Sequence, residues 1–80
     1  MHEAKLCLSL LELALERLGE AGGERIVALC VRVGELSGVV PDALASAFPI
    51  CALGTRAEGA ELALERAPGR ELVLREIEVV

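Results

Sequence analysis

The sequence is poor in aromatic residues: Phe48 is the only one, and tryptophan and tyrosine are absent. A hydrophobic core must therefore be built from leucine, valine, isoleucine and alanine, which dominate the 54% of residues that are hydrophobic. No apolar run approaches the roughly 20 residues that a membrane-spanning helix needs, so no membrane is expected as a partner. With 80 residues, the chain is expected to form a single domain, residues 1–80, whose core is only marginally sufficient.

Basic residues and cysteine pairs are also scarce. The chain has 8 Lys and Arg against 13 Asp and Glu, a net charge of −5, which argues against nucleic acid and anionic membrane as partners. Cys7, Cys30 and Cys51 are odd in number and widely spaced, and none belongs to a CxxC pair. We therefore expect reduced thiols in a cytoplasmic protein, with no zinc site and no disulfide framework.

Apolar residues recur at helical spacing from Ala4 to Leu18, which predicts an amphipathic helix. Gly19 and Gly22-Gly23 are expected to end it. The apolar stripe consists of Ala4, Cys7, Leu11, Ala14 and Leu18. Further leucines widen it on both flanks, namely Leu8 and Leu15 on one side and Leu6 and Leu13 on the other. This surplus reflects either ordinary leucine abundance or a surface for a partner, including a second copy in a homo-oligomer.

The middle of the chain is predicted to form a strand followed by a helix. Residues 25–33 alternate, with Val27, Leu29, Val31 and Val33 expected on the apolar face. A glycine-containing segment, residues 34–38, ends this strand. Pro41 fits the first position of a second helix that runs to about Leu53 and ends at Gly54. Pro49 lies inside that helix and is expected to kink or shorten it, at a cost of roughly 3 kcal/mol.

The last third of the chain predicts two more strands. Residues 60–67 alternate with Leu62 and Leu64 inward, and Pro68-Gly69 favours a tight turn into a final antiparallel strand. In that strand the alternation slips by one residue near Arg75-Glu76, as a β-bulge would produce. The predicted fold class is α/β, with two layers in which two helices pack on one face of a three-stranded sheet. The predicted order is helix-strand-helix-strand-strand.

The first three residues offer a metal chelate. The α-amine of Met1, the backbone nitrogen of His2 and the His2 imidazole can close two adjoining chelate rings on one ion. Glu3 adds a further amide nitrogen or a carboxylate. This nitrogen-rich, nearly planar set suits Ni(II) or Cu(II) and suits Ca²⁺ or Mg²⁺ poorly. Taken alone, a histidine at position 2 is more often incidental than functional.

The sequence contains no recognisable set of catalytic residues. A reactive cysteine would need a nearby histidine base, and the single histidine is His2 at the chain end. There is no catalytic triad, phosphate-binding loop or acid pair. We therefore expect no catalytic activity.

Several further segments carry a pattern in order: Met1-His2-Glu3, residues 33–44 (VGELSGVVPDAL), residues 54–55 and 57–62, and residues 69–72 and 77–79. Together, at matching spacing, they resemble the HypA/HybF family of hydrogenase nickel-incorporation proteins. The resemblance implies that His2, with Met1 and Glu3 beside it, binds a nickel ion that the protein transports. It also implies that the nickel passes to the large subunit of [NiFe]-hydrogenase with the help of a maturation GTPase. Glu35 and Asp42 are weaker candidates, since a turn and a helix start explain them.

The sequence departs from that family in one respect. Family members carry a zinc-ribbon module with two CxxC pairs between the last two strands, whereas here Ala67-Pro68-Gly69-Arg70 joins the strands directly. The chain is either a natural short paralogue or one from which the module was removed. Two functions stay open. One is a nickel metallochaperone domain that binds one ion, and the other is a metal-free interaction module that has lost delivery.

Overall fold

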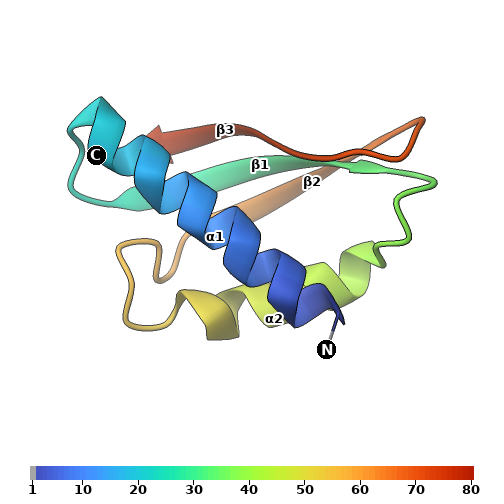
Figure 1. Ribbon diagram of the computed structural model, residues 1–80. Coiled ribbons are helices and arrows are strands. Elements are labelled where there is room, and N and C mark those ends of the chain that lie inside the picture. Colours follow the sequence, from blue (N-terminus) through green and yellow to red (C-terminus); the bar gives the residue numbers. More distant parts are fainter. Residues whose placement is uncertain (1) are drawn as a thin grey trace.

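The computed structural model describes residues 2–80, with side chains described from Glu3 onward. Its elements follow the predicted order: α1 (His2–Ala21), β1 (Ile26–Gly34), α2 (Pro41–Ala52), β2 (Glu61–Ala67) and β3 (Leu72–Val79). Both helices lie on one side of the sheet (Figure 1). The two-layer α/β prediction is therefore confirmed. No helix in the described part of the chain is long and apolar enough to cross a bilayer.

The strand order in the sheet is β2-β1-β3, with β1 in the centre. β1 pairs in parallel with β2 and antiparallel with β3. A parallel neighbour requires a crossover between the two strands, and α2 provides it because it lies between β1 and β2 in the chain. α1 packs mainly against α2, and also lies over β3 and β1.

The core between the helices and the sheet is aliphatic apart from Phe48 and Cys7. Its buried members include, from the helices, Cys7, Leu10, Leu11, Ala14, Leu18, Leu44, Phe48 and Ala52, and, from the strands, Ile26, Leu29, Val31, Val33 and Leu74. The predicted stripe of the first helix faces this core, except that Ala4 at its end is only partly buried. These residues form one cluster, as expected of a single small domain.

The flanking leucines of α1 do not form one exposed patch. Leu8 is 50% exposed and Leu13 is 39% exposed, whereas Leu6 and Leu15 are partly buried. Leu8 and Leu13 lie about 140° apart around the helix, given about 100° per residue. A single partner surface would therefore meet one of them but not both. Self-association of this chain stays a prediction.

Both helices end close to the predicted positions. α1 continues through Gly19 and ends at Ala21, before Gly22, whose φ of 73° suits glycine. α2 ends at Ala52, one residue before the predicted end, and Pro49 lies within it. Pro49 lacks the N–H that would bond to the carbonyl of Ala45, but both residues are exposed. Water can therefore solvate that carbonyl, which lowers the cost of the proline.

The pairing of β1 with β3 contains two register shifts. One falls between Cys30 and Val31 of β1 and leaves Arg75 of β3 as the extra residue, so the predicted bulge near Arg75-Glu76 is confirmed. The other falls between Ile26 and Ala28. At this shift Ile26 faces the core and is 1% exposed to solvent, whereas Val27 is 38% exposed. The prediction that Val27 faces the core was therefore wrong, because alternation assumes an unbroken register.

The connection from β2 to β3 crosses over the end of β1. Because β1 lies between the two strands, they run antiparallel without pairing with each other, and residues 68–71 pass over β1 instead of closing a hairpin. The crossing backbone accepts three hydrogen bonds: Gly34 N–H donates to Glu71 O, Glu35 N–H to Ala67 O and Leu36 N–H to Gly69 O, each at 2.8 Å. The crossing passes so close that a Cβ on Gly34 would lie 2.5 Å from Gly69 O.

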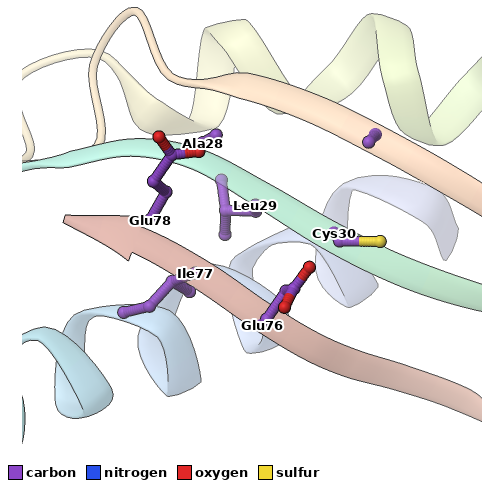
Figure 2. Close-up of a pocket in the computed structure, with 7 residues that line it drawn as sticks. Ala28, Leu29, Cys30, Glu76, Ile77 and Glu78 are labelled. Carbon is purple, nitrogen blue, oxygen red and sulfur yellow. The ribbon is translucent and has the colours of Figure 1, made fainter.

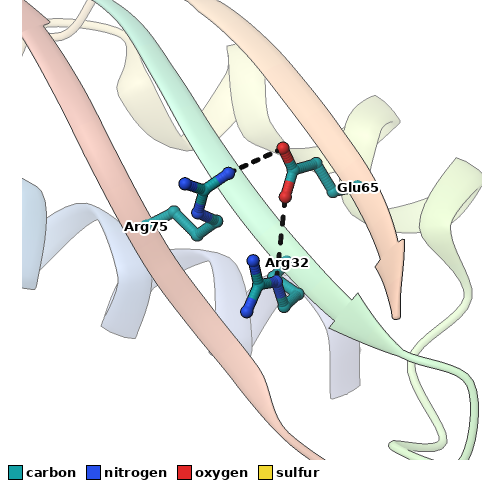
Figure 3. A network of polar contacts seen from close by, with 3 residues as sticks. All are labelled: Arg32, Glu65 and Arg75. Atoms are coloured by element: carbon teal, nitrogen blue, oxygen red, sulfur yellow. Dashed lines mark hydrogen bonds and ion pairs between the residues drawn. The ribbon is translucent and has the colours of Figure 1, made fainter. Parts of the chain in front are cut away.

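Three charged side chains link the strands on the sheet. Arg75 Nη1 on β3 donates a hydrogen bond to Glu65 Oε2 on β2 at 2.8 Å, and Arg32 Nε on β1 lies 3.7 Å from Glu65 Oε1 (Figure 3). The hydrogen bond from Arg75 lowers the pKa of the Glu65 carboxyl below its ordinary value. The network is solvent-exposed, so it orders this surface more than it stabilises the fold.

Candidate metal site at the start of the first helix

The proposed metal ligands lie where α1 begins. The helix starts at His2, and Glu3 is the acidic residue of its first turn. Met1 and the His2 side chain lie outside the described residues, so Glu3 is the only predicted ligand whose side chain is described. That side chain is partly exposed. The helix therefore begins earlier than the predicted Ala4 and includes two of the three predicted ligands.

A helix start leaves backbone nitrogens available to a metal. The first four N–H groups of an α-helix have no partner within the helix, and those of His2 and Glu3 are among them. An amide that binds nickel loses its proton, and here that loss breaks no intrahelical hydrogen bond. The positive helix end opposes a cation by about 0.3–1 kcal/mol. This opposition is small beside the roughly 10 kcal/mol or more that a structural zinc site contributes, so it does not by itself exclude a bound cation.

Cys51 of α2 touches the first turn of α1. Its thiol lies 4.0 Å from the carbonyl oxygen of Ala4, the residue after Glu3. Sequence reasoning missed this neighbour, because nothing in the local pattern shows where two helices cross. Spacing indicated only that Cys51 lies on a helix with a buried side.

The two weaker candidates lie elsewhere. Glu35 is exposed in the turn after β1, and this turn lies away from the start of α1 in Figure 1. Its backbone supports the crossing connection instead, since its N–H donates to Ala67 O. Asp42 is in the first turn of α2. It precedes Cys51 by about 13 Å along the helix axis, at 1.5 Å per residue.

The cysteines do not assemble a metal centre. From residue 2 to residue 80, no three His, Cys, Asp or Glu side chains are grouped so that they could hold an ion, within the side chains described. Cys7 is buried on α1, Cys51 lies beside it on α2, and Cys30 lies on β1. Cys30 instead lines a groove of about 330 Å³ together with Ala63, Glu76 and Glu78 (Figure 2). Burial and the nearby Glu65 raise the pKa of the Cys30 thiol.

The fold and the chain end together define a class of protein. It is a small two-layer α/β domain whose first helix begins at the candidate metal ligands. The comparison with known families makes the class specific. This chain belongs to the HypA family, described as hydrogenase/urease nickel incorporation metallochaperones, whose sequence profile matches residues 1–79.

Curated relatives agree with this assignment. The chain is 55% identical over 69 residues to the hydrogenase maturation factor HypA of Deinococcus radiodurans, covering 86% of this chain and 58% of that protein. It is 46% identical over 70 residues to the HypA of Geobacter sulfurreducens, covering 88% of this chain and 61% of that protein. The chain therefore spans about three-fifths of the length of these relatives.

A solved structure supports the fold. The solution structure of the Ni metallochaperone HypA from Helicobacter pylori matches with a TM-score of 0.74 at 17% identity. The match covers 92% of this chain and 70% of that chain. At this identity the likeness shows that the two proteins share a fold, and it carries no residue roles.

Proposed function

We propose that this chain is the nickel-binding domain of a metallochaperone for [NiFe]-hydrogenase maturation. One Ni(II) ion is held by the α-amine of Met1 and by the backbone nitrogen and imidazole of His2, with Glu3 as a further donor. The observation that carries the proposal is the start of α1 at His2 in a chain whose family match begins at residue 1. The ligands are then joined covalently to a rigid helix, and their backbone nitrogens need no rearrangement.

The position of the chelate at the start of α1 also suits delivery of the nickel ion. A chelate at the end of a helix is reached from solvent, so an acceptor can replace its ligands one at a time. We propose that the acceptor is the hydrogenase large subunit, that a maturation GTPase assists, and that the transfer takes place in the cytoplasm. The family match and the curated hydrogenase maturation factors support this proposal.

A second function is favoured by one observation. The direct crossing from β2 to β3, where the family resemblance implies a zinc-ribbon module in other members, fits a domain that keeps its interaction surface without delivering metal. One measurement separates the two functions. A metal-free interaction module predicts no nickel binding by the chain that begins at Met1, whereas a nickel metallochaperone predicts one ion per chain.

Calorimetric titration with Ni(II) tests the proposal. We expect one ion per chain at pH 7 and weaker binding as the pH falls. Nickel must displace protons from an amine with a pKa of about 8 and from an imidazole with a pKa near 6.5, and also from any amide that it captures. About two protons should be released for each ion at neutral pH, which titration in buffers of different ionisation enthalpy measures. Binding that is unchanged at pH 5.5 would contradict this set of ligands.

Zinc should play no structural part in this domain. The cysteines form no CxxC pair, and the described side chains hold no group of three metal donors. We therefore expect chelator-washed protein to contain no stoichiometric zinc and to keep its helical and strand content, unlike a zinc finger. Elemental analysis and circular dichroism in EDTA measure both. One tightly held zinc per chain would contradict the prediction that the zinc-ribbon module and its site are absent.

A further inference from the structure

Two cysteines meet where α1 crosses α2. Cys7 on α1 is 0% exposed, whereas Cys51 on α2 is partly exposed to solvent. The Cys51 thiol also contacts the Ala4 carbonyl, one helical turn before Cys7. Cys51 packs against the buried cluster that contains Cys7. Burial, and then the nearby Cys51, raise the pKa of the Cys7 thiol to about 12. Neither thiol is part of the proposed nickel chelate.

Cys30 provides a contrast within the same chain. It lies on β1, and the groups that affect its thiol are Glu65, Arg75 and Glu76 of the neighbouring strands. Neither of the other cysteines is among these groups. An oxidised Cys30 therefore has no second thiol beside it in the same chain, while an oxidised Cys51 has Cys7.

We propose that Cys7 and Cys51 form a peroxide-sensitive dithiol, which closes to an intramolecular disulfide between α1 and α2. The oxidant is a small peroxide, such as hydrogen peroxide. Cys51 reacts first because its side chain is partly exposed to solvent. The inference does not depend on the proposed nickel function. The disulfide would hold the first turns of α1, from which the nickel ligands extend, covalently against the end of α2.

The chemistry balances in two steps. The Cys51 thiolate attacks one oxygen of hydrogen peroxide, so that an S–O bond forms, the O–O bond breaks and hydroxide leaves and takes up a proton. The Cys7 sulfur then attacks the sulfur of the Cys51 sulfenic acid. The S–S bond forms, the S–O bond breaks, and the hydroxyl group leaves as water with the proton of Cys7. In total, two thiols lose two electrons and one peroxide is reduced to two waters.

Mass spectrometry of the full 80-residue chain, treated with hydrogen peroxide and then alkylated, tests the proposal. We expect the monomer to lose about 2 Da, two hydrogen atoms, before alkylation and then to take up one alkyl group instead of three, with a proteolytic fragment pair joined through Cys7 and Cys51. A phosphine reductant should reverse both changes. The melting temperature should rise by about 10 °C on oxidation, because the cross-link restricts the unfolded chain.

Variants separate this disulfide from other oxidation. Cys30→Ala should cross-link like the unchanged protein, whereas Cys51→Ala should not lose the 2 Da. Cys51 is the safer position to change because it is partly exposed and alanine favours a helix. Two results would overturn the proposal: Cys51 that accumulates as sulfinic acid while Cys7 remains free, or disulfides that join two chains through Cys30.

Discussion

An extension placed before Met1 is expected to abolish nickel binding, even though His2 remains in the chain. The extension converts the α-amine into an amide and so removes one of the strong nitrogen donors from the proposed chelate. His2→Ala should have an equally large effect, because it removes the only imidazole in the sequence. Loss of a group that merely orients a ligand costs 10–100-fold in affinity. We therefore expect loss of a ligand itself to cost at least about 100-fold.

Calorimetry on the protein that begins at Met1, on the extended protein and on His2→Ala, under one set of conditions, makes this comparison. Glu3→Gln is the matched control at the next position. It keeps the backbone nitrogen and removes only the carboxylate charge, so its loss should be smaller. Circular dichroism should be the same for all four proteins, since the changes fall at or before the first residues of α1 and alter none of the core residues described. If the extended protein binds as tightly as the unextended one, the ion is held elsewhere.

Gly34→Ala is expected to be among the most destabilising single substitutions in this chain. Its Cβ would lie 2.5 Å from Gly69 O, 2.8 Å from Glu71 O and 2.9 Å from Glu71 N, all of them backbone atoms. The crossing connection must move away, which disturbs the hydrogen bonds that residues 34–36 donate to it. We expect a loss of about 3 kcal/mol, most of the roughly 5 kcal/mol that holds a domain of this size.

Gly19→Ala is the matched control for this substitution. Gly19 lies within α1, and an added Cβ there would meet nothing within 4 Å. Alanine should therefore stabilise the helix by up to about 1 kcal/mol. Urea unfolding, followed by circular dichroism, should move the midpoint in opposite directions for the two variants. A Gly34→Ala protein with an unchanged midpoint would show that the connection can move without cost.

Much of the fold followed from local pattern. The apolar stripe of the first helix predicted the face that it buries, and the slip near Arg75-Glu76 predicted the bulge. Both are short-range features, because a helix repeats every 3.6 residues and a strand every two. Val27 was misassigned because its position depends on how β1 pairs with β3, which the sequence of β1 alone does not show. Gly19 did not end the first helix, because a single glycine costs a helix only about 1 kcal/mol and the chain continues helical to Ala21.

The candidate metal site could be proposed from the sequence alone, because its donors are consecutive, and it stays a prediction. Met1, His2 and Glu3 are joined by covalent bonds, so their chelating geometry needs no tertiary contact. Only the tertiary structure placed β1 between β2 and β3, passed the connection over Gly34, and brought Cys51 against the first helix. The physical reason is distance along the chain. Residue spacing determines which face of an element is apolar, whereas packing of the whole core decides which elements become neighbours.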